Sequence, residues 1–166
     1  MQNICFTGHR QIRNDDTLTM RLEETLRNLI EQHGATDFYS GGAIGWDTLC
    51  AETVLKFRNA YPHIRLHLIL PCCEAEQTAS WNNVQKENYR KILSAADSVE
   101  FVSEHYYDGC MKKRNSRLIE VADCCVCYYN EKRSASGTGQ TVRMALKRNI
   151  NIVNLFSSSS FPIDTK

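Results

Sequence analysis

The feature that most constrains the fold is a regular alternation of short apolar runs with segments of helical periodicity. The runs have the length of buried strands, and they lie at residues 4–8, 37–40, 64–70, 98–102, 124–129 and 152–156. Between them, apolar side chains recur every three or four residues, which is typical of helices that bury one face. This order predicts a doubly wound, Rossmann-like α/β domain: a mainly parallel six-stranded sheet with helices on both faces.

The composition agrees with one globular domain that binds small ligands. The 166 residues are 42% hydrophobic and 23% charged, and the formal net charge of +1 gives no strong attraction to nucleic acid or membrane. The predicted sheet and helices fill residues 1–156, and residues 157–166 read as a short C-terminal tail. No apolar run is long enough for a membrane span, and no secretory signal is visible. We therefore expect a cytoplasmic protein with reduced cysteines and no membrane contact.

Ligands of doubly wound sheets bind beyond the carboxyl ends of the strands, so the first turn to consider follows residue 6. It reads Thr7-Gly8-His9-Arg10. Glycine lets the backbone approach a ligand closely, and threonine and arginine can bind phosphate or carboxylate. His9 could donate to a phosphate or act as an acid or base. An ordinary strand-to-helix turn with a surface arginine fits this short motif equally well.

The second turn is rich in glycine and directly precedes a helix. It begins with Ser40-Gly41-Gly42, and Asp47 falls in the first turn of the following helix. Backbone N–H groups of such a turn, together with the helix N-terminus, form an anion cradle. Asp47 would either hold a ribose hydroxyl or simply interact favourably with the helix dipole.

The third turn, after the strand at 124–129, combines small and hydroxyl side chains. Ser136, Gly137 and Thr138 precede a helix that we expect to begin at or near Thr141. The second and third turns thus have similar chemistry and lie at one sheet edge, which indicates a phosphate-bearing ligand. The sequence lacks a Walker motif and a G-x-G-x-x-G pattern, which argues against an ATPase and an NAD dehydrogenase.

The cysteines favour packing over metal binding. Cys124, Cys125 and Cys127 lie on a predicted strand, where residues three apart point to opposite faces and cannot share a metal ion. Cys72 and Cys73 follow a strand end, but adjacent cysteines cannot readily chelate one ion and no helper is evident nearby. We therefore predict no metal site.

Taken together, these motifs resemble the SLOG superfamily, specifically its YpsA-like branch. The resemblance rests on residues 5–10, 40–47, Arg114-Asn115 and Ser136-Gly137-Thr138 with Thr141, in the expected order over almost the whole chain. It implies a Rossmann-like fold that binds a nucleotide or nucleotide derivative as a sensor or accessory protein. In this reading Arg10 and Arg114 neutralise phosphate, and Trp81 belongs to the pocket.

Two other functions known among SLOG proteins remain as alternatives. One is a phosphoribohydrolase of the LOG type, which splits the N-glycosidic bond of nucleoside monophosphates. Its P-G-G-x-G-T-x-x-E motif corresponds to residues 135–143, where Arg143 replaces the glutamate. The other is single-stranded nucleic-acid binding of the DprA type, which we rank lower because the chain has almost no net charge. No cofactor is firmly implied. A second copy of the chain and a protein partner stay open as partners.

Overall fold

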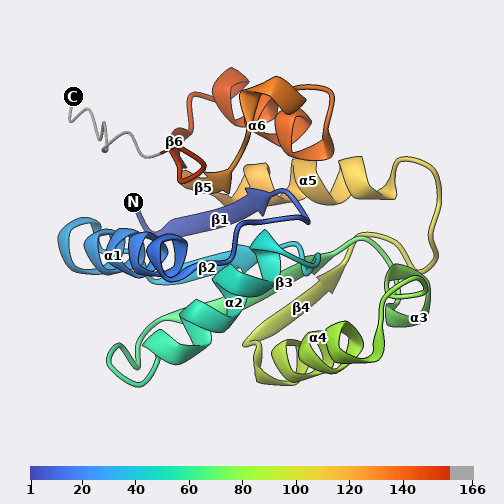
Figure 1. Ribbon diagram of the computed structural model, residues 1–166, viewed down its shortest axis with the longest axis horizontal. Helices are drawn as coiled ribbons and strands as arrows, with labels where there is room; N and C mark the ends of the chain where they lie inside the picture. Colours follow the sequence, from blue (N-terminus) through green and yellow to red (C-terminus); the bar gives the residue numbers. More distant parts are fainter. Residues whose placement is uncertain (158–166) are drawn as a thin grey trace.

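The centre of the molecule is one six-stranded sheet in which all neighbouring strands are parallel (Figure 1). This computed structural model describes residues 1–157, so the predicted tail at 157–166 lies, apart from Ser157, outside the described residues. The strands are β1 (Asn3–Gly8), β2 (Asp37–Ser40), β3 (Arg65–Leu70), β4 (Ser98–Phe101), β5 (Cys124–Tyr128) and β6 (Asn151–Asn154). Each predicted apolar run therefore overlaps one strand, with β1 and β6 each beginning one residue before the predicted run.

Helices follow the strands in the predicted alternation. They are α1 (Asp16–His33), α2 (Trp46–Phe57), α3 (Glu74–Gln77), α4 (Asn83–Ala95), α5 (Cys110–Val121) and α6 (Gly137–Lys147), with a 3-10 turn at Glu131–Arg133. Two details differ from the expectation. The segment at 72–80, where the sequence shows no helical periodicity, contains the short α3, and α6 begins at Gly137 rather than near Thr141. Within residues 1–157, no helix is long and apolar enough to cross a membrane.

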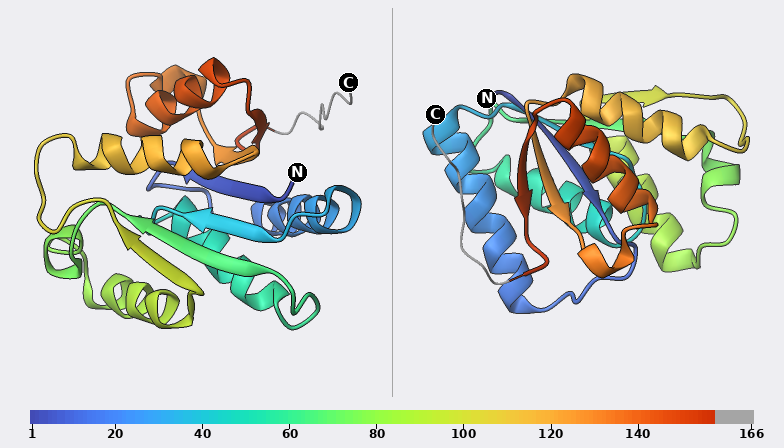
Figure 2. Two further views of the ribbon diagram at one scale, coloured as in Figure 1. Left: turned by 180° about the vertical axis from the view of Figure 1, so that it is seen from behind. Right: turned by 90° about the horizontal axis from the view of Figure 1, so that it is seen from above.

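The strand order β4-β3-β2-β1-β5-β6 places the topological switch between β1 and β5. From β1 the chain steps outward through β2, β3 and β4, and then returns past β1 to add β5 and β6 on its other side. Helices α1, α2 and α4 cover one face of the sheet, and α5 and α6 cover the other (Figures 1 and 2). This arrangement is the predicted doubly wound Rossmann-like fold. In such sheets the switch point is where ligands bind.

The two faces of the sheet bury separate apolar clusters. The cluster under α1, α2 and α4 includes Phe6, Trp46 and Cys124, and the cluster under α5 and α6 includes Leu118 and Cys127. Cys124 and Cys127 thus point to opposite faces, as predicted for residues three apart on a strand. All eight cysteines are free thiols.

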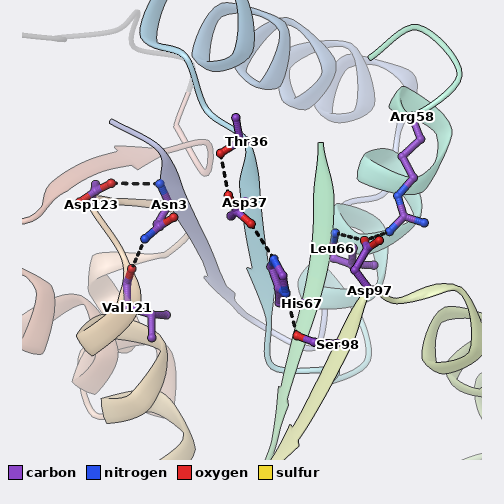
Figure 3. Close-up of polar contacts among 10 residues, drawn as sticks. All are labelled: Asn3, Thr36, Asp37, Arg58, Leu66, His67, Asp97, Ser98, Val121 and Asp123. Carbon is purple, nitrogen blue, oxygen red and sulfur yellow. Dashed lines mark hydrogen bonds and ion pairs between the residues drawn. The ribbon is translucent and has the colours of Figure 1, made fainter. Parts of the chain in front are cut away.

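Polar side chains fix the amino ends of the strands, at the sheet edge opposite the switch-point turns (Figure 3). His67 on β3 bonds through Nε2 to the Asp37 carboxylate on β2 at 2.8 Å and through Nδ1 to Ser98 Oγ on β4 at 2.7 Å. The carboxylate of Asp123, just before β5, accepts from the backbone N–H of Asn3 at 3.0 Å. These contacts tie neighbouring strands together in the observed register.

Candidate functional site

A cavity of about 500 Å³ opens at the switch point. Its walls come from the β1 turn, the start of α2, one face of α5, the 3-10 turn and the start of α6. A volume of this size suits a small-molecule ligand. The lining residues are Phe6, Thr7, Gly8, His9, Arg10, Gln11, Ala43, Asp47, Met111, Arg114, Asn115, Leu118, Arg133, Ser136, Gly137 and Thr138.

The turn after β1 is held rigidly across the end of β5. The backbone N–H of His9 donates to the carbonyl of Tyr128 at 3.2 Å, and the His9 carbonyl accepts from the N–H of Trp46 at 3.3 Å. Gly8 packs against the indole of Trp46 so closely that a Cβ would overlap it. Close packing within the protein therefore requires glycine here, and Gly8 also lines the cavity.

His9 is a neutral structural ring in this arrangement. The residue is buried, and Nε2 accepts a hydrogen bond from the backbone N–H of Asn130 at 3.1 Å. Burial lowers the pKa of His9, and the nearby charge of Arg133 lowers it further. The ring therefore orders the loop after β5, and it does not bring a positive charge to the cavity at neutral pH.

The glycine-rich turn after β2 does form an anion cradle, but the protein's own Asp47 occupies it. The Asp47 carboxylate accepts from the N–H of Ala43 at 3.3 Å. Ser40, which does not line the cavity, accepts from the N–H of Gly42 and donates to the Asp47 carbonyl, both at 3.3 Å. The N–H of Gly42 is thus bonded within the protein, and neither Gly41 nor Gly42 lines the cavity. Contact of these two glycines with a ligand stays a prediction.

Arg114 on α5 completes this arrangement from the other face of the sheet. Its Nη1 donates to the Gly41 carbonyl and lies 3.6 Å from the Asp47 carboxylate. Both side chains are buried, and the Nε of Arg114 has no hydrogen-bond partner. Burial raises the pKa of Asp47, and the arginine opposes that rise; burial likewise lowers the pKa of Arg114. The two charges form a buried pair in the cavity wall.

The N-terminus of α6 provides the cavity with backbone donors. Ser136 caps the helix by accepting from the N–H of Gly139 at 3.1 Å. The N–H groups of Gly137 and Thr138 stand at the first two helical positions, where no intrahelical acceptor exists. Thr141 does not line the cavity. Its hydroxyl donates to the Gly137 carbonyl at 2.9 Å and stabilises the first turn of α6. The earlier start of α6 places Gly137 and Thr138 inside its first turn.

Several lining residues were not predicted. Met111 and Leu118 share one face of α5 with Arg114 and Asn115, at the i, i+3, i+4 and i+7 positions of a helix. Their spacing from Arg114 could have identified them. Arg133 could not be found in this way, because it lies in the polar segment that folds into the 3-10 turn.

Two residues considered in the sequence lie elsewhere. Trp81 is buried in the core, edge-on to Tyr89 at a ring-centroid distance of 5.7 Å, and it does not line the cavity. Its large apolar ring is accommodated under α4 rather than at the ligand edge. Arg143, at the position of the LOG glutamate, donates to the Ser134 carbonyl at 2.7 Å and borders a separate depression beside β6. Among the residues that line the cavity, Asp47 is the only carboxylate.

The sheet order and the cavity define a Rossmann-like domain with an open cavity at its topological switch point. The model of the YpsA family, described as the YspA SLOG family, matches residues 5–156. The chain therefore belongs to this SLOG family.

Similar proteins agree with that assignment. A UPF0398 protein of Halalkalibacterium halodurans is 30% identical over 69% of this chain, which corresponds to 60% of that protein. A UPF0398 protein of Bacillus thuringiensis is 26% identical over 82% of this chain and 78% of its own length. DNA processing protein A from Helicobacter pylori, whose structure was described for its single-stranded DNA binding mode, superposes with a TM-score of 0.61 at 20% identity. That match covers 91% of this chain and 63% of the neighbour, and it shows a shared fold.

Proposed function

We propose that the switch-point cavity binds a nucleotide or a nucleotide derivative and that the chain acts as a sensor or accessory protein. The observation that carries the proposal is the combination of donors and charge in one cavity. Three arginines line it against a single carboxylate, and that carboxylate is already paired with Arg114. The excess positive charge therefore belongs to the exposed Arg10 and Arg133.

The α6 N-terminus supplies the complementary feature for a phosphate. The N–H groups of Gly137 and Thr138 carry the partial positive charge of the helix dipole, and phosphate is the group that such a terminus favours. Arg133 lies four residues before Gly137 and lines the same cavity. In the proposed complex the phosphate lies at this terminus, between Arg133 and Arg10. The more apolar wall of Met111 and Leu118 faces the base or sugar.

Thermal unfolding in the presence of nucleosides and their mono-, di- and triphosphates tests this proposal. A ligand that binds only the folded state, present at a concentration of about 100 times its Kd, stabilises the protein by about 2.7 kcal/mol. We expect a shift with at least one phosphorylated ligand and a smaller one with the matching nucleoside. Arg10→Ala and Arg133→Ala should reduce it. Arg148→Ala, an exposed arginine at the other end of α6, is the matched control.

The proposal fails if no phosphorylated nucleoside of the panel shifts the transition. It also fails if Arg10→Ala and Arg133→Ala respond to the ligand as the wild type does. Base release during the incubations, followed by chromatography, would instead assign the phosphoribohydrolase activity. Such activity would require the buried Asp47 to leave Arg114, since no other carboxylate lines the cavity.

Single-stranded nucleic-acid binding is a second candidate, and the likeness to the Helicobacter pylori protein favours it. Binding of this kind depends steeply on salt because each neutralised phosphate releases counterions. A fluorescent oligonucleotide titrated at two salt concentrations separates the candidates. The affinity for a mononucleotide held by two exposed arginines should depend only weakly on salt concentration. The affinity for a single-stranded oligonucleotide should fall steeply as the salt concentration rises.

A further inference from the structure

We propose that Cys73, Glu76 and His105 form a binding site for a divalent transition-metal ion of the Zn²⁺ type. Within residues 1–157, these three side chains form a group whose ligand atoms all lie within 4.8 Å of one another. None of them lines the switch-point cavity, and the proposal is independent of the function proposed above. The sequence alone predicts no metal site, because no helper for Cys72 and Cys73 is evident nearby. His105 lies far from Cys73 along the chain, and only the fold brings the two together.

Sheet topology brings the three residues together. Cys73 follows β3 and immediately precedes α3, Glu76 lies within α3, and His105 lies in the loop after β4. Since β3 and β4 are parallel neighbours, their carboxyl ends reach the same edge of the sheet (Figure 1). The backbone N–H of Cys73 donates to the Glu104 carbonyl at 3.2 Å and joins the two loops directly.

The proposed ligands are already oriented toward one another. One carboxylate oxygen of Glu76 bonds to His105 Nδ1 at 2.8 Å, and the other accepts from the backbone N–H of Tyr106. The Tyr106 N–H therefore holds the Glu76 carboxylate in place through a backbone donor that a metal ion would not displace.

The chemistry of the three ligands suits zinc. Thiolate sulfur, imidazole nitrogen and carboxylate oxygen are its usual protein ligands, at about 2.0–2.3 Å. A tetrahedral site then needs ligand atoms roughly 3.3–3.8 Å apart. Ligand atoms as much as 4.8 Å apart must therefore close by roughly 1 Å. Glu76 Oε1 and His105 Nδ1, now 2.8 Å apart, must exchange their hydrogen bond for the metal and separate by roughly 0.5 Å. The His105 side chain is 71% exposed and can rotate to do so. Three protein ligands leave one coordination position open to water or an anion.

Thiol labelling tests the site directly, because Cys73 is the one cysteine that is not buried. Chelator-treated protein is alkylated under native conditions with and without Zn²⁺, and the labelled residue is identified by mass spectrometry. We expect a single labelled thiol, Cys73, and at least tenfold slower labelling with one equivalent of Zn²⁺. Co²⁺ should produce a thiolate-to-metal charge-transfer band that Cys73→Ala abolishes.

His105→Gln and Glu76→Gln should each raise the Zn²⁺ concentration needed for protection at least tenfold. His63→Gln, which removes an exposed histidine elsewhere, should leave it unchanged. The proposal is overturned if Zn²⁺ does not slow the labelling of Cys73. It is equally overturned if His105→Gln and Glu76→Gln are protected like the wild type, since the metal then contacts the thiol alone.

Discussion

Replacing Arg114 by methionine should expose how much the buried pair in the cavity wall contributes to stability. The variant keeps most of the side-chain volume but leaves the Asp47 carboxylate buried without its cation, which lies 3.6 Å away in the wild type. At an effective dielectric constant of about 20, that separation corresponds to an attraction of about 4.6 kcal/mol. Breaking one partner of a buried pair costs about 3–5 kcal/mol. We expect the free energy of unfolding to fall by that amount at pH 8.

The loss should shrink as the pH falls. Burial already raises the pKa of Asp47, and removing Arg114 raises it further. Between the unfolded pKa of about 3.9 and this raised value, the folded variant binds more protons than the unfolded chain. Its free energy of unfolding therefore rises as the pH falls through that window. The double variant with Asp47→Asn removes both charges and should recover most of the loss.

Urea unfolding, followed by tryptophan fluorescence and circular dichroism at pH 8, 6.5 and 5, measures these effects relative to the wild type. The reasoning is refuted if the deficit of Arg114→Met is the same at every pH and the double variant is no more stable than the single one. That result would mean that the arginine acts through its packing and its bond to the Gly41 carbonyl, and not through the Asp47 charge.

Three further outcomes follow from contacts at and near the cavity. In urea melts, Gly41→Ala should cost about as much as Arg114→Met, roughly 3–5 kcal/mol, because its methyl group would overlap the guanidinium. Gly137→Ala places its methyl in open space on a helical residue, so it should be neutral or should stabilise the protein by less than about 1 kcal/mol. The free energy of unfolding of the wild type should fall as the pH falls from about 6.5 toward the lowered pKa of His9, because the folded state binds fewer protons than the unfolded chain in this range. His9→Gln should remove this part of the pH dependence. Trp81→Ala should lower the free energy of unfolding by about 3–5 kcal/mol and leave the ligand-induced shift in thermal transition unchanged.

The sheet could be predicted because each strand carries its own local signal. Apolar runs such as 64–70 are long enough to mark a buried strand, and the glycines at the end of β1 and after β2 mark the turns. The strand order could not be predicted in this way, because several orders are compatible with the same alternation of strands and helices. Only the packed structure shows that β5 lies beside β1. The short α3 was missed because four polar and small residues carry no helical periodicity.

The site was predicted in its parts but not in its connections. The sequence identifies Arg114 and Asp47 as candidate site residues. They belong to helices on opposite faces of the sheet, so no local sequence pattern predicts their contact. The glycine-rich turn offers N–H groups in the sequence, and only the fold shows that Asp47 turns back to accept from Ala43. His105 beside Cys73 is a third case, since parallel pairing of β3 and β4 creates the contact.

The carboxylate of Asp47 gives the glycine-rich turn a permanent internal substitute for a bound anion. A loop that becomes ordered only when it binds a phosphate loses conformational entropy on binding, and that loss lowers the affinity. Here the turn is organised before any ligand enters, by Asp47 from within and by Arg114 from across the sheet. The wall of the cavity formed by this turn is thus preformed, and differences in affinity among ligands should arise mainly at the exposed arginines and the start of α6.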